Sequence, residues 1–253
     1  MIVNLIQDDT SIIELDNGFY FGKGLFETIL VLDKPIFLEE HLRRLNGGLN
    51  FLGIDTVITE ELVLENIKGC SNCAVKIAVS EKNIVFSKRE LSYTLEHYNK
   101  GFKVKLGSIK RNPYSHMVRL KSLNYIENIL EKNLAAKENF NEVLFLNTDN
   151  FLAEGSLSNV FVITKEGILT PSTQCGLLDG VVRNFLIKEL STNYNIVETT
   201  ISLDDINSCQ GMFLTNSLMG LMWINEFNGI KFSRHRLYDE IKNYYDNYIL
   251  KPL

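Results

Sequence analysis

The sequence predicts an α+β protein with mixed sheets, organised as two domains. Many short runs rich in β-branched and aromatic residues follow one another along the chain, with only a few helices between them. The regular alternation of strand and helix that builds a doubly wound parallel sheet is missing. A length of 253 residues is enough for two modest domains, each with its own hydrophobic core.

The predicted strands show the apolar runs that are typical of buried sheets. They span residues 27–32, 74–80, 84–88, 102–109, 142–147, 159–164, 168–170, 196–200 and 211–215. A polar stretch with a proline break, residues 111–115, interrupts this pattern and predicts a domain boundary at residues 110–118. We therefore expect an N-terminal α/β domain over residues 1–112 and a second domain over residues 118–253.

Apolar residues at helical spacing predict the main helices. The stripes consist of Leu38, Leu42, Leu45, Leu49 and Leu52; Ile126, Ile129, Leu130, Leu134 and Phe140; Val182, Phe185, Leu186 and Leu190; and Leu237, Ile241 and Tyr244. Gly53 is expected to end the first of these helices. Thr59, followed by two glutamates, predicts the start of one more short helix, to about Lys68.

Composition and charge exclude several classes of partner. The net charge of −5 and the pI near 5.5 argue against nucleic acid or an anionic membrane. The first fifteen residues, MIVNLIQDDTSIIEL, lack the basic region of a signal peptide, and no apolar run approaches the roughly 20 residues that span a bilayer. The sequence therefore predicts a soluble, cytoplasmic protein.

Cys70 and Cys73 form a C-x-x-C pattern that could be redox-active or supply half of a zinc site. A structural zinc site needs about four ligands, and no second cysteine or histidine pair with suitable spacing follows. Cytosolic proteins seldom keep disulfides. We therefore expect reduced, structural thiols and no metal site.

Three segments carry residues suited to chemistry. Residues 117–120 form a strand-like approach to Lys121, which directly precedes a helix. Glu154 lies at the mouth of an apolar strand, where a carboxylate needs a cationic partner such as a protonated pyridine nitrogen. The turn at residues 178–180 leads into a helix whose free N–H groups suit a phosphate. Taken singly, the first and third segments could also be a solvated lysine and an ordinary helix start.

In combination, these motifs resemble the fold-type IV pyridoxal phosphate enzymes, which have a D-amino acid aminotransferase-like architecture. The matching segments are D-N-G-F-Y-F-G-K-G-L-F-E-T at 16–28, H-L-R-R-L at 41–45, K-S-L-N at 121–124, E-G-S-L-S-N at 154–159, L-D-G-V-V-R at 178–183 and F-L-T-N-S-L at 213–218. The resemblance extends from about residue 16 to about residue 230. It implies that residues 118–253 form a pyridoxal phosphate-binding domain with a mixed sheet or barrel, and that the protein is a homodimer.

The resemblance also implies roles for particular residues. Lys121 is the implied Schiff-base lysine, which later acts as general base and acid. Glu154 is the implied carboxylate on the pyridine nitrogen, and Arg44 is the implied phosphate ligand. The other implied cofactor contacts are Leu178 on the ring face, the backbone N–H groups of Val181 and Val182, and the side chains of Asn216 and Ser217.

The subclass depends mainly on Thr28. A threonine after F-E resembles the 4-amino-4-deoxychorismate lyases, in which the hydroxyl lies over the reacting carbon, although it could simply be a β-branched strand residue. Residues 81–89 lack the R-x-H carboxylate motif of D-amino acid aminotransferases, which leaves Lys88 or Arg89 as candidate partners of a substrate carboxylate. K-S-L-N also lacks an extra residue that branched-chain aminotransferases have.

The implied activity is therefore the folate-pathway reaction that yields 4-aminobenzoate and pyruvate. A branched-chain or D-amino acid aminotransferase of the same fold is the alternative within the class. A non-enzymatic binding protein that kept the fold is an alternative of another kind. The presence of both Lys121 and Glu154 argues against it.

Overall fold

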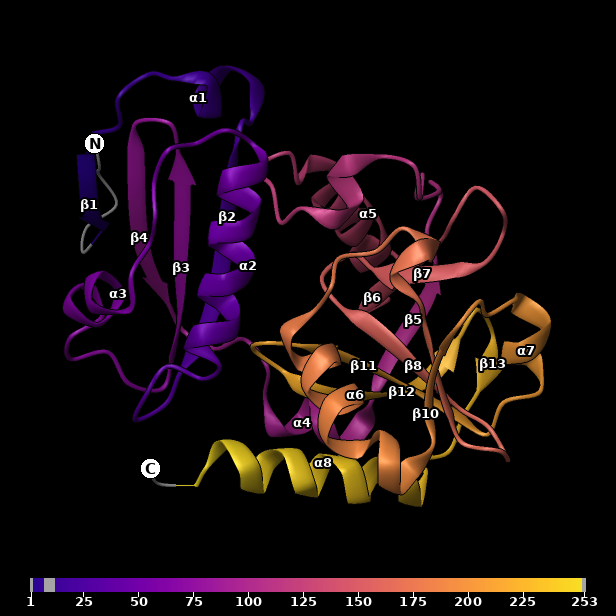
Figure 1. Cartoon of the computed structure of the whole chain (residues 1–253). Coiled ribbons are helices and arrows are strands. Elements are labelled where there is room, and N and C mark those ends of the chain that lie inside the picture. The colour runs from indigo at the N-terminus through magenta and orange to yellow at the C-terminus, as the bar shows by residue number, and fades with distance from the viewer. Residues whose placement is uncertain (1, 7–11, 252–253) are drawn as a thin grey trace. The chain divides into compact units, whose positions relative to one another are not determined.

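The computed structural model describes residues 2–6 and 12–251 (Figure 1). Contacts divide the chain into two compact units. The smaller consists of Met1–Ser92 and Leu120–Tyr125, and the larger of Tyr93–Arg119 and Ile126–Leu253. The segment that carries Lys121 therefore belongs to the smaller unit, although it follows the boundary expected at residues 110–118. The division into domains 1–112 and 118–253 stays a prediction.

The smaller unit is built on a four-stranded sheet with the strand order β1-β4-β3-β2. Strand β1 is parallel to β4, and the other neighbours are antiparallel. The strands are β1 (Ile2–Ile6), β2 (Gly24–Val31), β3 (Cys73–Ser80) and β4 (Asn83–Arg89), and the helices are α1 (Asn17–Phe21), α2 (Leu38–Phe51) and α3 (Glu60–Asn66).

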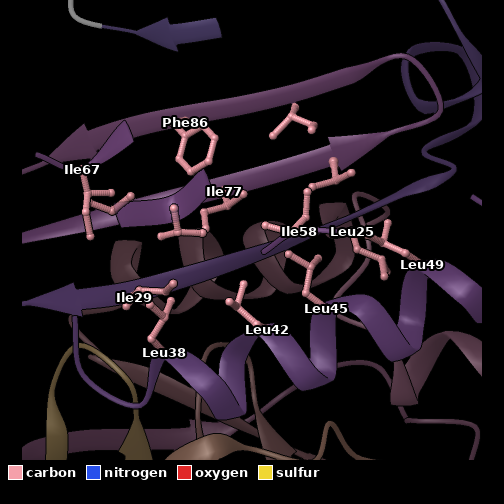
Figure 2. Close-up of a cluster of buried hydrophobic side chains, with 14 of the residues drawn as sticks. Leu25, Ile29, Leu38, Leu42, Leu45, Leu49, Ile58, Ile67, Ile77 and Phe86 are labelled. Atoms are coloured by element: carbon pink, nitrogen blue, oxygen red, sulfur yellow. The ribbon is translucent and has the colours of Figure 1, made fainter. Parts of the chain in front are cut away.

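Helix α2 covers one face of this sheet, as its leucine stripe predicts. Figure 2 shows Leu42, Leu45 and Leu49 pointing toward Leu25 and Ile29 of β2, and all five are buried. Since successive strand side chains point to opposite faces, the residues between Leu25 and Ile29 alternate between the helix side and the opposite side of the sheet. Glu27 therefore lies on the helix side of the sheet, and Phe26 and Thr28 lie on the opposite side, although the three residues are consecutive in sequence.

The larger unit contains a mixed nine-stranded sheet, which confirms the predicted fold class. Its strand order is β10-β9-β8-β11-β12-β5-β6-β7, and β13 pairs with β12. Strand β5 is parallel to β6 and β12, and β9 is parallel to β10, while the remaining pairs are antiparallel. The strands are β5 (Phe102–Leu106), β6 (Glu142–Leu146), β7 (Leu152–Gly155), β8 (Asn159–Ile163), β9 (Ile168–Pro171), β10 (Ile196–Thr199), β11 (Gly211–Asn216), β12 (Gly220–Phe227) and β13 (Ile230–Lys231). The helices are α4 (Leu95–Lys100), α5 (Ile126–Lys137), α6 (Val181–Tyr194), α7 (Leu203–Asn207) and α8 (Arg236–Ile249).

The strand-like approach expected before Lys121 is wrong. Residues His116–Arg119 form a 3₁₀ turn instead, which begins where the Ser115 hydroxyl accepts a hydrogen bond from the Met117 amide at 3.2 Å. None of the described strands pairs with this segment, so a short local turn satisfies its backbone.

The inward face predicted for the C-terminal helix is also partly wrong. Helix α8 buries Tyr238, Ile241 and Tyr245, whereas Tyr244 is 40% exposed. The Tyr238 hydroxyl donates to the Leu221 carbonyl at 3.2 Å. Gly220 leaves room for the Tyr245 ring, since a Cβ there would lie 2.6 Å from it. The helix is thus rotated to bury two tyrosines that the apolar pattern did not include.

Helix α5 forms as predicted, but its apolar stripe does not face the core. Ile126, Ile129, Leu130 and Leu134 are between 41% and 64% exposed on the single chain. The buried residues of this helix are Asn128, Glu131 and Ala135. No helix of the described residues is long and apolar enough to cross a membrane.

Candidate active site

Lys121 lies beside β2 in the smaller unit. Its carbonyl accepts a hydrogen bond from the Phe26 amide at 2.8 Å, and the Leu123 amide donates to the Gly24 carbonyl at 2.9 Å. The Lys121 ammonium nitrogen is 4.5 Å from the centroid of the Phe26 ring and 5.2 Å from that of Tyr125. These two rings meet edge to face at 5.1 Å. The backbone thus holds Lys121 where its amine contacts two aromatic rings.

Thr28 shares a sheet face with Phe26, because the two residues are two positions apart on β2. The Thr28 side chain is half-buried, and Lys76 of β3 lies directly opposite it in the register. The Lys76 ammonium is 4.3 Å from the centroid of the same Phe26 ring that Lys121 contacts. The structure therefore brings both predicted catalytic residues, Thr28 and Lys121, close to one aromatic side chain.

Arg44 is held on the other face of the sheet, the face that α2 covers. Its Nε donates to Oε1 of Glu27 at 2.7 Å, and its Nη2 donates to Oε2 at 2.8 Å. His41 Nδ1 lies 2.7 Å from the same Oε2. Burial opposes ionisation of Glu27, but the charges and hydrogen bonds of Arg44 and His41 outweigh it and hold the pKa of Glu27 well below its ordinary value. The role of Arg44 as a phosphate ligand stays a prediction.

We expect Arg44→Ala to lower the free energy of unfolding by about 3–5 kcal/mol, because it leaves the buried Glu27 carboxylate without its bidentate partner. The pKa of Glu27 is lower in the folded state than its ordinary value of 4.5, so the stabilisation is present above about pH 4.5 and is lost as the pH falls below it. The deficit of the variant should therefore shrink in acid. Urea unfolding at several pH values measures it.

Arg43→Ala is the matched control. Arg43 is the neighbour of Arg44 on α2, and within the part of the chain that the structure describes its only ion pair is an exposed one with Glu39. It should leave both stability and cofactor affinity nearly unchanged. If Arg44 also binds the phosphate, its removal should weaken cofactor binding by about 2–5 kcal/mol, and excess cofactor should restore part of the rate. Equal cofactor affinity in the two variants would show that Arg44 does not bind the cofactor phosphate.

In the larger unit, Glu154 lies at the end of β7 with its carboxylate buried. Its Oε2 accepts a hydrogen bond from the Leu178 amide at 2.9 Å. Its Oε1 is 3.2 Å from Nε of Arg111, an ion pair in which the N–H of Nε does not point at the oxygen. Arg111 is itself buried, with its guanidinium 4.1 Å from the centroid of Phe145. The structure thus supplies a cation beside Glu154 from the chain itself.

Sequence reasoning missed Arg111, because it assigned residues 111–115 to a polar connection. The available signal was the cost of burying Glu154, which requires a cationic partner. That requirement identifies the charge of the partner but not its position along the chain. The bridge between Arg111 and Asn147, next to β6, brings the Arg111 side chain close to Glu154.

Helix α6 begins with an uncapped N-terminus inside the protein. Its N-cap residue is Gly180, and no side chain caps it. The backbone amides of Val181 and Val182 donate to no acceptor among the described residues, although both residues are buried. A Cβ at Gly180 would lie 1.8 Å from Oδ1 of Asn159, so only glycine permits this close approach. Buried, unpaired N–H groups at a helix N-terminus are suited to an anion such as a phosphate.

Asn216 and Ser217 lie at the turn between β11 and β12. The Asn216 amide group donates to the Leu157 carbonyl at 3.2 Å, and its oxygen accepts from the Leu218 and Met219 amides at 3.0 and 2.8 Å. Asn216 therefore shapes the turn and connects it to the segment that follows Glu154. The half-buried Ser217 hydroxyl has no hydrogen-bond partner among the described residues, so it is available to a ligand.

The residues present fit pyridoxal phosphate. The larger unit offers buried N–H donors at α6 and the Ser217 hydroxyl for a phosphate, and the Glu154 carboxylate for a ring nitrogen. Asn159 connects the Glu154 segment to the α6 turn, since its amide donates to the Leu178 carbonyl at 2.9 Å. The smaller unit offers the primary amine of Lys121. The sequence resemblance assigns both sets of residues to one cofactor.

Comparison with known proteins identifies the class. The fold is that of the fold-type IV pyridoxal phosphate enzymes: a structure described as a putative 4-amino-4-deoxychorismate lyase from Legionella pneumophila has a TM-score of 0.86 at 25% identity and covers 97% of this chain and 98% of its own. A hypothetical aminotransferase from Mycobacterium tuberculosis in its pyridoxal phosphate-bound form has a TM-score of 0.84 at 19% identity, with 97% and 95% covered. The model of the family described as amino-transferase class IV matches residues 24–227, and the chain belongs to this family.

Two curated relatives are named for different activities. The aminodeoxychorismate lyase of Bacillus subtilis (strain 168) is 29% identical over 85% of this chain and 81% of its own length. A putative branched-chain-amino-acid aminotransferase of Methanocaldococcus jannaschii is 26% identical over 88% of this chain and 85% of its own. The chain is therefore a class IV pyridoxal phosphate enzyme that acts on a small molecule.

Proposed function

We propose that this enzyme is a 4-amino-4-deoxychorismate lyase, which releases 4-aminobenzoate and pyruvate. The observation that carries the proposal is the place of Thr28, on the sheet face where Phe26 contacts the Lys121 amine. The lyase from Bacillus subtilis supports it. A class IV aminotransferase for branched-chain or D-amino acids is the second candidate, favoured by the relative of similar identity from Methanocaldococcus jannaschii.

Lys121 performs the proton transfers in the proposed reaction. Pyridoxal phosphate, when bound, supplies an electron-accepting ring that stabilises negative charge on the carbon bearing the substrate amine. The Lys121 Nζ takes the proton from that carbon. The enolpyruvyl group then leaves with the electron pair of its C–O bond, the ring becomes aromatic, and Lys121 or a water returns a proton to the released enolpyruvate.

The neighbouring side chains prepare Lys121 and the ring for these steps. Phe26 and Tyr125 contact the Lys121 amine and limit the directions in which it can point. The Thr28 hydroxyl positions or relays a proton at the reacting carbon. Glu154 would keep the ring nitrogen of a bound cofactor protonated, and the Leu178 backbone amide orients the Glu154 carboxylate.

Incubation with 4-amino-4-deoxychorismate tests the activity directly. The purified enzyme should form 4-aminobenzoate, which is followed by its fluorescence. D-alanine and branched-chain amino acids, each with 2-oxoglutarate, are the comparison substrates. Transamination of one of these without any 4-aminobenzoate would assign the enzyme to the second candidate.

We expect Thr28→Val to reduce 4-aminobenzoate formation by about 10²–10⁴-fold, the usual contribution of a positioned acid–base group. Valine keeps the β-branched shape of threonine and removes only the hydroxyl, so cofactor binding should change little. Thr28→Ser, which restores a hydroxyl, should recover most of the rate. A Thr28→Val enzyme with the wild-type rate would show that Thr28 is only a strand residue.

A further inference from the structure

We propose that Lys76 and Arg89 form an anion site that binds the carboxylate groups of the substrate. This site lies wholly within the smaller unit. The inference rests on the proposed function for the identity of the substrate, but the site itself is argued from the geometry of the sheet.

The strand register places both cations on one face. Thr28 of β2 is opposite Lys76 of β3, and Lys76 is opposite Ser87 of β4. Arg89 is two positions beyond Ser87 on the same strand, so its side chain emerges on the same side as those of Thr28 and Lys76. This face is the one turned away from α2.

The same register separates the two candidates for a carboxylate partner that the sequence leaves open. Lys88 is opposite Val75, which belongs to the core that packs under α2. Lys88 therefore emerges on the helix side, and Arg89 on the side of Thr28. Lys76, which the sequence motifs did not indicate, is the second member of the site.

Neither cation has a carboxylate partner within the described residues. Other lysines near this sheet do, since Lys23 pairs with Glu81 at 2.7 Å and Lys82 pairs with Glu14 at 2.5 Å. Partial desolvation of its amine beside the Phe26 ring, together with the positive charge of Arg89, lowers the pKa of Lys76, although the side chain as a whole is exposed. Two neighbouring cations that repel each other are stabilised by an anion between them.

The site is also within reach of the reacting group. The amines of Lys76 and Lys121 contact the same Phe26 ring, at 4.3 and 4.5 Å from its centroid, so their nitrogens are separated by no more than the sum of these distances. A substrate whose amine-bearing carbon is next to Lys121 can therefore extend an acidic group toward Lys76. Arg89 continues the positive charge along the same face.

The chemistry of the substrate matches two cations. Each product, 4-aminobenzoate and pyruvate, carries one carboxylate, and the reaction releases no other carbon group, so the substrate carries two. An arginine binds a carboxylate through two parallel donors, and a lysine acts as a compact point charge. The pair is thus suited to a dicarboxylate rather than to an amino acid with an apolar side chain.

Binding of chorismate to the cofactor-loaded enzyme tests the site without requiring turnover. Chorismate keeps both carboxylates but has a hydroxyl in place of the ring amine, so it cannot react with the cofactor. Its dissociation constant is measured by calorimetry for the wild type, Lys76→Met, Arg89→Met and the control Lys88→Met, which removes the same charge from the opposite face. We expect each of the first two variants to weaken binding about tenfold or more, and Lys88→Met to leave it unchanged.

Salt and kinetics give two further readouts. Chorismate binding to the wild type should weaken as ionic strength rises, since the site is exposed to solvent, and the dependence should be smaller in the two site variants. The KM for 4-amino-4-deoxychorismate should rise in both variants with a smaller effect on kcat. If the wild type forms no 4-aminobenzoate but the variants still lose chorismate affinity, the anion site stands and the proposed function fails. If the wild type binds no chorismate, or binds it as tightly in Lys76→Met and Arg89→Met, the anion site is wrong.

Discussion

Lys121→Ala should abolish turnover, the largest effect expected for any single substitution in this enzyme. Loss of the proton transfer alone is expected to cost about 10²–10⁴-fold, and the loss of the amine that binds the cofactor covalently adds to it. The purified wild type should be yellow, and borohydride should attach the cofactor to the peptide that contains Lys121. The variant should retain cofactor only non-covalently, because the phosphate donors of the larger unit are unchanged.

Two results would contradict this assignment. One is a colourless wild-type protein that cannot be reconstituted with pyridoxal phosphate. The other is a borohydride label on a different lysine. A loss of activity through misfolding is checked by adding a small primary amine such as methylamine, which should restore part of the rate to a folded Lys121→Ala enzyme. The Lys121 amine contacts the rings of Phe26 and Tyr125, and the loss of these two cation–π contacts should cost about 1 kcal/mol of stability.

Glu154→Gln should lower the rate strongly even when cofactor is saturating. The amide oxygen of glutamine can still accept from Leu178, but it carries no charge to keep a ring nitrogen protonated. The buried Arg111 loses its ion-pair partner at the same time, so we expect stability to fall by about 3–5 kcal/mol as well. Single-turnover kinetics at saturating cofactor, combined with urea unfolding, separates the two effects.

Glu131→Gln is the matched control for this variant. Glu131 is another buried carboxylate of the larger unit, and it accepts a backbone hydrogen bond from Ser108 at 2.8 Å, much like that between Leu178 and Glu154. Its substitution should reduce stability but leave the rate of the folded, cofactor-saturated enzyme unchanged. If Glu154→Gln changes only cofactor affinity or stability, Glu154 does not control the electronic state of the cofactor.

Most of the candidate site could be predicted from the sequence, because its residues stand in short motifs. Lys121, Glu154 and the turn before α6 each occur in a segment of four to six residues that resembles the family. Arg111 and Lys76 stand in no such segment. Their functional relevance depends on which strand lies beside them and on which side of the sheet they emerge.

The sequence alone determined the local structure and the family. Apolar spacing predicts α2, α5, α6 and α8, and the β-rich runs predict most of the strands, because periodicity reflects which side of each element is buried. The motif order predicts the class of enzyme, which the family match confirms.

Only the tertiary structure decided which neighbours in sequence act together. Glu27 and Thr28 are adjacent, yet one binds Arg44 under α2 and the other faces the side of Lys121, because successive strand residues point in opposite directions. The exposed stripe of α5 shows the same limit, since an apolar pattern predicts burial but does not say against what. Contacts between distant segments, such as Arg111 with Glu154, depend on strand order and register, which no local pattern encodes.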